Sequence, residues 1–201
     1  MSDTPQLSTH RLFIAFSVPD VVKREIEKVQ NELRQSLPEG SVRWTRPEHF
    51  HLTLRFLGNV ATDHTDKLAA SLRMVCGQFA PLKVRAERLG FFPERGFPQV
   101  IWIAVSNPDQ QLARLQNEIQ AASQQFTSEP AEKTFSGHIT LGRAKKIRHQ
   151  EADILANFAV KMRTRIFGEW EVCHVELLRS ELIPEGPRYT LKAAIPLGTS
   201  N

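Results

Sequence analysis

The chain has 201 residues, of which 41% are hydrophobic and 24% are charged, as is usual for a soluble globular protein. No apolar run approaches the roughly 20 residues of a membrane-spanning helix, and the N-terminus lacks the basic start of a signal peptide. The formal net charge of +4 is a mild excess that favours an anionic substrate. Two cysteines, Cys76 and Cys173, exclude a disulfide framework, and both are expected to be buried thiols in a reducing cytoplasm.

Hydrophobic spacing predicts strands and helices in alternation. In chain order we expect a strand at 11–18, a helix at 20–37, strands at 42–44 and 50–57, a helix at 64–79, strands at 82–89 and 100–105, a helix at 109–126, a strand at 136–143, a helix at 150–160, and strands at 171–182 and 188–195. The Phe-, Pro- and Gly-rich segment 91–98 and the polar segment 127–133 predict loops, and 184–187 predicts a hairpin turn. This order favours an α+β fold with helices packed outside antiparallel sheets.

One tetrapeptide pattern occurs twice, as HLTL starting at His51 and HITL starting at His138. Because side chains alternate along a strand, His51 and Thr53 share one face, and His138 and Thr140 share the corresponding face of the second strand. The aliphatic residues between them then face the core. Two such strands predict a cleft in which two imidazoles face one substrate, as concerted acid–base chemistry near neutral pH requires.

Each motif is reached through a strand, a long helix and a return, which predicts a bilobal, pseudo-twofold arrangement with a central cleft. We expect a single domain over 1–201 with a core over 10–197, two intertwined lobes and flexible termini. Basic residues near both motifs predict a positive rim around the cleft; they are Arg43, Arg46, Arg143, Lys145, Lys146 and Arg148, with Lys161, Arg163 and Arg165 farther on.

Together these residues resemble a known family. HLTLRFLG from His51 and HITLGR from His138 resemble the paired motifs of the 2H phosphoesterases, and most closely those of the bacterial and archaeal RNA 2′,3′-cyclic phosphodiesterases, also called 2′–5′ RNA ligases. RLFIAFSVP from Arg11 resembles the opening strand of that branch, and RSELIPEGPRYTL from Arg179 resembles its closing hairpin. The resemblance covers 11–197.

The resemblance implies metal-independent opening of a 2′,3′-cyclic phosphate to a 2′-phosphomonoester, with no cofactor. His51 would donate a proton to the leaving oxygen, and His138 would accept one from water. Thr53 and Thr140 would bind the non-bridging phosphate oxygens. The implied partners are RNA with cyclic phosphate ends or cyclic nucleotides, and some family members also join tRNA halves. We expect a cytoplasmic protein that does not bind membranes, with a monomer as the default state.

Two arginines are candidates for the cation that stabilises charge on the phosphate. Arg143 occupies the family's equivalent position, but it is an odd number of residues from His138, so it enters the cleft only if Gly142 ends or bends the strand. Arg55 shares the parity of His51 and Thr53 but is not a fixed part of the family motif.

Three alternatives remain open. The His49–His51 pair has metal-ligand spacing, and with His64, His138 and His174 it allows a metal-dependent phosphohydrolase, although neither motif face carries a carboxylate. A non-catalytic RNA-binding module could use the aromatic and basic residues Phe91, Phe92, Phe97, Arg85, Arg88 and Arg95. Another cyclic nucleotide, such as ADP-ribose 1″,2″-cyclic phosphate, is compatible with the same motifs.

Overall fold

The computed structural model describes residues 8–184 and 186–198. Most of the termini predicted to be flexible, and Glu185 in the predicted hairpin turn, lie outside the described residues. The strands are β1 (Thr9–Ser17), β2 (Val42–Trp44), β3 (His51–Ala61), β4 (Leu82–Phe92), β5 (Val100–Ser106), β6 (His138–Ala144), β7 (Ile166–Val172), β8 (His174–Ile183) and β9 (Gly186–Pro196). The helices are α1 (Asp20–Ser36), α2 (Thr65–Cys76), α3 (Gln111–Ser123) and α4 (His149–Lys161), with short 3-10 turns at Pro47–His49, Thr62–His64 and Gln124–Phe126.

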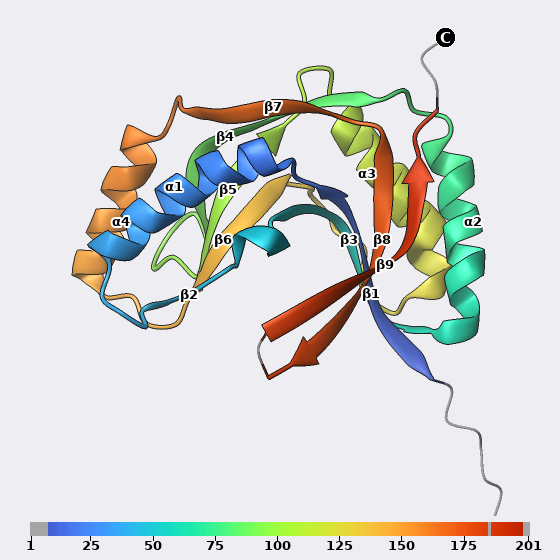
Figure 1. The fold of residues 1–201 in the computed structure, drawn as a ribbon, viewed down its shortest axis with the longest axis horizontal. Coiled ribbons are helices and arrows are strands. Elements are labelled where there is room, and N and C mark those ends of the chain that lie inside the picture. Colours follow the sequence, from blue (N-terminus) through green and yellow to red (C-terminus); the bar gives the residue numbers. More distant parts are fainter. Residues whose placement is uncertain (1–7, 185, 199–201) are drawn as a thin grey trace, which may run out of the picture.

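The strands form a sheet with two matching halves (Figure 1). The order is β7-β4-β5-β6-β3-β1-β8-β9, with β2 added beside β6, and the pairings between neighbours are antiparallel. The halves meet where β3 pairs with β6 through Leu52 and Ile139 alone. Because the two motif strands are these central neighbours, the topology brings both histidines to the middle of the molecule.

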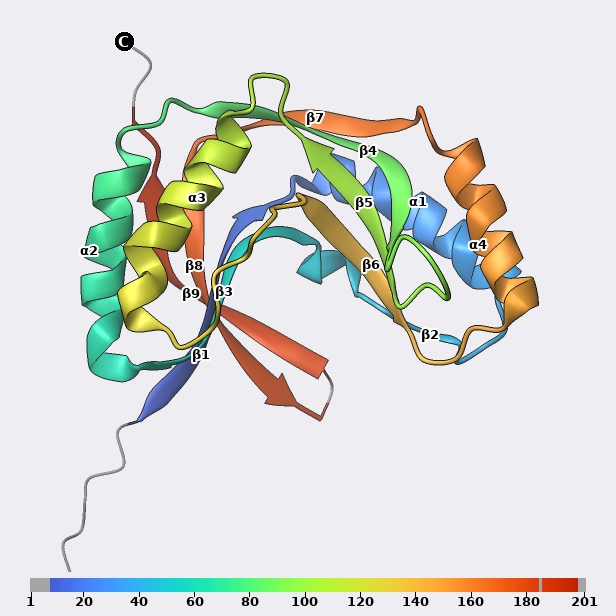
Figure 2. The ribbon, with the colours of Figure 1, turned by 180° about the vertical axis from the view of Figure 1, so that it is seen from behind.

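Two helices cover each half of the sheet. Helices α1 and α4 lie on the half that contains β6, and α2 and α3 lie on the half that contains β3 (Figures 1 and 2). The core between sheet and helices is apolar, with Phe16, Ile26, Leu72 and Leu115 fully buried. The predicted α+β class and bilobal arrangement are confirmed. Within the described residues, no helix is both long and apolar enough to cross a membrane.

Strands β3 and β4 end four and three residues later than predicted. Strand β3 continues past Gly58 to Ala61, because β1 pairs with it as far as Thr9 and the left-handed φ of +61° at Gly58 accommodates a register shift. Strand β4 includes Phe91 and Phe92, which were predicted to lie in a loop.

The predicted strand at 171–182 joins the end of β7 to most of β8, and residues 166–170 of β7 were not predicted as a strand. Strand β7 pairs with β4 in one half, and β8 pairs with β1 in the other, so the chain crosses between the halves at Cys173. The expectation that both cysteines are buried is therefore wrong for Cys173, which is exposed at this crossing, whereas Cys76 is buried.

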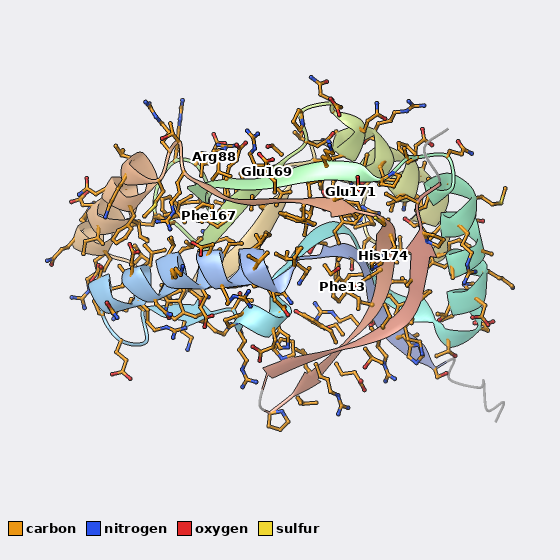
Figure 3. All side chains as sticks on the ribbon, turned by 45° about the horizontal axis from the view of Figure 1, so that its top comes forward. Phe13, Arg88, Phe167, Glu169, Glu171 and His174 are labelled. Carbon is orange, nitrogen blue, oxygen red and sulfur yellow. The ribbon has the colours of Figure 1, made fainter. Side chains whose placement is uncertain are left out.

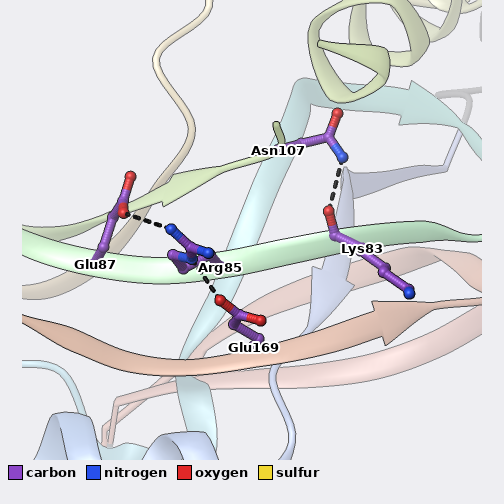
Figure 4. Close-up of polar contacts among 5 residues, drawn as sticks. All are labelled: Lys83, Arg85, Glu87, Asn107 and Glu169. Carbon is purple, nitrogen blue, oxygen red and sulfur yellow. Dashed lines mark hydrogen bonds and ion pairs between the residues drawn. The ribbon is translucent and has the colours of Figure 1, made fainter. Parts of the chain in front are cut away.

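Charged side chains connect β4 to β7, the strand at the edge of this half of the sheet. Arg85 on β4 lies between Glu87 on its own strand and Glu169 on β7 (Figure 4). Its Nε donates to Glu169 Oε1 at 2.6 Å, and its Nη1 lies 3.9 Å from Glu87 Oε2. A side-chain amide of Asn107 donates to the carbonyl of Lys83 nearby.

Candidate active site

A cleft of about 470 Å³ lies where the two halves of the sheet meet. Both motif histidines and both motif threonines line it, together with Ser180 of β8 and Tyr189 of β9, and these two strands form a hairpin in Figures 1 and 2. The other lining residues include two arginines, four Phe or Tyr residues, a third histidine and a glutamate, namely Arg11, Arg143, Phe13, Phe56, Phe135, Tyr189, His49 and Glu132. The residues that the sequence predicts as an acid–base pair with phosphate ligands are thus in one cavity.

A β-bulge follows the His-x-Thr unit in each motif strand. In β3 the register with β1 shifts between Thr53 and Arg55, and in β6 the register with β5 shifts between Thr140 and Gly142. The extra residue in both cases is a buried leucine. A bulge reverses the face alternation beyond it, so the third residue after each threonine, rather than the second, returns to the cleft.

This reversal brings Arg143 into the cleft, and Phe56 occupies the equivalent place in β3. The predicted bend near Gly142 is therefore observed, with the bulge at Leu141. Gly142 has a separate role: a Cβ on it would lie 2.7 Å from Val42 Cγ1, so its small size lets β2 pack closely on β6.

The expectation that Arg55 faces the cleft is wrong. The bulge turns Arg55 to the opposite face, where only 1% of the residue is exposed. Its guanidinium donates to the carbonyls of Glu129 (2.9 Å) and Pro130 (2.7 Å) and to the Oε1 atoms of Gln120 (3.2 Å) and Gln124 (3.1 Å). Arg55 therefore ties the motif strand β3 to the segment that leads into β6, and it does not contact a substrate in the cleft.

Each motif histidine is oriented by a backbone carbonyl two residues earlier. Nδ1 of His51 lies 2.7 Å from the carbonyl oxygen of His49, and Nδ1 of His138 lies 2.8 Å from that of Ser136. A carbonyl oxygen only accepts, so Nδ1 carries a proton in both rings. Nε2 is then the atom that gives or takes a proton in the cleft.

Aromatic rings pack against both imidazoles. The His51 ring centroid lies 5.1 Å from that of Phe13 and 5.5 Å from that of Tyr189. The His138 ring centroid lies 5.1 Å from that of Phe92 and 6.3 Å from that of Trp102. These contacts restrict ring rotation, so each Nε2 keeps its direction.

Burial shifts the pKa of two neighbouring groups that line the cleft, His51 and Tyr189. Burial lowers the pKa of His51 below its usual 6.5, opposed by the hydrogen bond to the His49 carbonyl and reinforced by the neighbouring His49 and His138 rings. Burial raises the pKa of Tyr189 above its usual 10, so its phenol stays neutral near pH 7. A bound phosphate would counter the effect on His51, because an anion favours the imidazolium.

Arg11 and Tyr189 were not predicted as site residues. Arg11 lies on β1, where its guanidinium stacks 4.8 Å from the centroid of Phe56, and Tyr189 reaches the cleft from β9. Their positions depend on the order of the strands beside β3, and a local sequence pattern does not predict that order. The only signal available was that both lie in the segments RLFIAFSVP and RSELIPEGPRYTL, which resemble the phosphodiesterase branch.

The metal-site alternative needs a third ligand beside His49 and His51. Among residues 8–184 and 186–198, no group of three or more His, Cys, Asp or Glu side chains is placed to hold a metal ion. The Nδ1 atom of His51 is already hydrogen-bonded to a carbonyl, and the His49 ring stacks 4.8 Å from that of Tyr189.

The residues of the proposed RNA-binding module are dispersed. Arg85 is paired with glutamates at the sheet edge, and Phe92 packs beside His138. Arg88 lies on the half of the molecule that carries α4, whereas Phe13 of the cleft lies on the other half (Figure 3). Phe97, which is 45% exposed, stacks on His149. Arg85 and Phe97 therefore contact residues that do not line the cleft, whereas Phe92 contacts the cleft residue His138.

The chain is similar in sequence to proteins of one family. The model of the LigT like Phosphoesterase family matches twice, at residues 16–102 and 103–189, so each match contains one His-x-Thr motif. An RNA 2′,3′-cyclic phosphodiesterase of Archaeoglobus fulgidus is 34% identical over 89% of this chain and 96% of its own length.

Solved structures share the fold. A Thermus thermophilus protein superposes with a TM-score of 0.77 at 28% identity, covering 95% of this chain and all of that one. Escherichia coli LigT complexed with 3′-AMP superposes with a TM-score of 0.71 at 21% identity, covering 94% of this chain and 99% of that one. With the family model matched over both halves and the paired motifs in one cleft, the chain belongs to the LigT-like phosphoesterase family.

Proposed function

We propose that this protein is an RNA 2′,3′-cyclic phosphodiesterase that opens cyclic phosphate ends to 2′-phosphomonoesters. The observation that carries the proposal is the presence of His51 and His138, each with Nδ1 bound to a carbonyl, in a single cleft with Thr53 and Thr140. The name of the Archaeoglobus relative supports the substrate class.

In-line displacement at phosphorus places the entering and leaving oxygens on opposite sides, so a base and an acid must face each other across the phosphate. His138 Nε2 takes a proton from water, the water oxygen bonds to phosphorus, and the bond to the 3′ oxygen breaks. His51 Nε2 gives its proton to that oxygen. A 5′-hydroxyl of a second RNA in place of water would form a 2′–5′ bond by the same step.

Charge on the non-bridging oxygens is stabilised by the threonine hydroxyls and the Arg143 guanidinium. Preorganised donors of this kind commonly supply the largest catalytic contribution. The hydroxyls are neutral, so they add no charge that would retain the product.

The proposal is tested with a short RNA that ends in a 2′,3′-cyclic phosphate. The cyclic end resists alkaline phosphatase, and the opened monoester is sensitive to it. We expect incubation with the protein to make the terminal phosphate removable by phosphatase. A terminal phosphate that stays resistant at every enzyme concentration would overturn the assignment.

Replacing either threonine with the isosteric valine should lower kcat by about ten- to a hundredfold, because one donor to the transition-state charge is lost. Thr164→Val, at an exposed position outside the cleft, is the matched control. Steady-state kinetics on a cyclic nucleotide measure the effect. If Thr53→Val and Thr140→Val changed only KM, the hydroxyls would bind ground and transition states equally.

The pH dependence follows from the pKa of His51. The acid must be protonated, and burial lowers its pKa, so the protonated fraction in the free enzyme is lost at a lower pH than for an ordinary histidine. Bound phosphate raises the pKa again. The alkaline limb of kcat/KM, which reports the free enzyme, should therefore lie at lower pH than the alkaline limb of kcat. An alkaline limb at the same or higher pH in kcat/KM would contradict the donor role of His51.

A further inference from the structure

Two arginines face each other across neighbouring strands at one end of the cleft. Arg43 of β2 is the register partner of Arg143 of β6, and directly opposed residues in an antiparallel pair point to the same face. Arg143 lines the cleft, and so does Thr45, which directly follows β2 and whose backbone N–H donates to the carbonyl of Leu141 on β6. Arg43 therefore lies on the same face of the sheet as the cleft, just outside the residues that line it.

Neither guanidinium of this pair is neutralised by a carboxylate. Among the described residues, no Asp or Glu oxygen lies within 4 Å of a nitrogen of Arg43 or Arg143. The arginines of the β8–β9 hairpin differ, because Arg179 and Arg188 lie 3.1 and 3.6 Å from the carboxylate of Glu181.

Like charges placed directly opposite each other on a sheet destabilise it unless an anion lies between or beside them. Their Cα atoms are on strands roughly 5 Å apart, so two long guanidinium side chains can contact neighbouring phosphates of one polynucleotide strand. The exposed position of Arg43 leaves it open to such a ligand.

We propose that Arg43 binds the phosphodiester on the 5′ side of the terminal nucleotide while Arg143 stabilises the cyclic phosphate. This subsite rests on the proposed phosphodiesterase function and makes its substrate class more specific. The enzyme then selects the cyclic end of an RNA strand over a free cyclic mononucleotide, because only the strand carries the second phosphate.

The test compares three substrates: uridine 2′,3′-cyclic phosphate, the dinucleotide UpU with a 2′,3′-cyclic end, and the same dinucleotide with a neutral methylphosphonate link. We expect kcat/KM to be about five- to tenfold higher for the charged dinucleotide than for the other two. Arg43→Gln should remove this preference and lower the slope of log kcat/KM against log salt for the charged dinucleotide by about 0.7.

Arg73→Gln, an equal change of charge at an exposed position on α2, is the matched control and should retain the preference. Equal kcat/KM values for the mononucleotide and the charged dinucleotide would overturn the subsite while leaving the proposed function in place. A preference that persists with the methylphosphonate would assign it to the second nucleoside and would likewise overturn the role of Arg43. If no cyclic substrate were hydrolysed, the proposed function and the subsite would fail together.

Discussion

Replacing His51 or His138 with Ala is expected to lower kcat for cyclic phosphate hydrolysis by about 10²- to 10⁴-fold, the usual contribution of a positioned acid or base. Because both rings act in one transition state, the double variant should be only slightly slower than the slower single variant. The folded structure should persist, since both side chains line a cleft and do not fill the core.

His174→Ala is the matched control for these variants. His174 is on β8, and its Nε2 lies 3.5 Å from Oε1 of Glu176. It does not line the cleft, so its loss should leave kcat unchanged. Circular dichroism and thermal unfolding of each variant separate a catalytic loss from a folding defect. Near-wild-type kcat in either single variant would remove that histidine from the mechanism.

The second large effect is expected on stability. Arg55→Met should lower the free energy of unfolding by about 3 kcal/mol or more, because it removes the four hydrogen bonds that the buried guanidinium donates to Glu129, Pro130, Gln120 and Gln124. Methionine keeps a similar length and apolar stem, so the lost hydrogen bonds dominate the change. Arg55→Lys should be intermediate, since an ammonium group cannot reproduce the planar fork of donors.

Urea unfolding monitored by tryptophan fluorescence measures this change as a shift in midpoint at constant slope. Arg73→Met, at an exposed site on α2, is the matched control and should shift the stability by less than about 0.5 kcal/mol. If Arg55→Met were as stable as that control, the hydrogen bonds that link β3 to the segment before β6 would not contribute to stability.

The contrast between Arg55 and Arg143 shows how far sequence reasoning reaches. Alternation along a strand correctly places each histidine with its threonine, because the backbone is regular over those two steps. One step later a bulge inserts a buried leucine, and the alternation reverses in both strands. Bulges arise from pairing with neighbouring strands, so no local pattern reveals that Arg55 turns inward and Arg143 turns toward the cleft.

The same limit applies to residues contributed by other strands. Helices and most strands were predictable, because their apolar periodicity is local. Strand β7 was mostly missed, and its end was joined to β8, because the separation of the two strands reflects a crossing between halves of the sheet at Cys173. Arg11 and Tyr189 join the cleft only through long-range pairing of β1 and β9. The features that could not be predicted from the sequence are therefore mainly the register of the strands and their order in the sheet.

We expect His51 and His138 to open a 2′,3′-cyclic phosphate without a metal ion. The most direct measurement is hydrolysis of a 2′,3′-cyclic nucleotide in excess EDTA, with the position of the product phosphate assigned by phosphorus NMR. We expect full activity and a 2′-phosphomonoester. Activity that disappears in EDTA and returns with added metal would contradict the two-histidine mechanism, and a 3′-phosphomonoester would contradict the assignment of the 3′ oxygen as the leaving group.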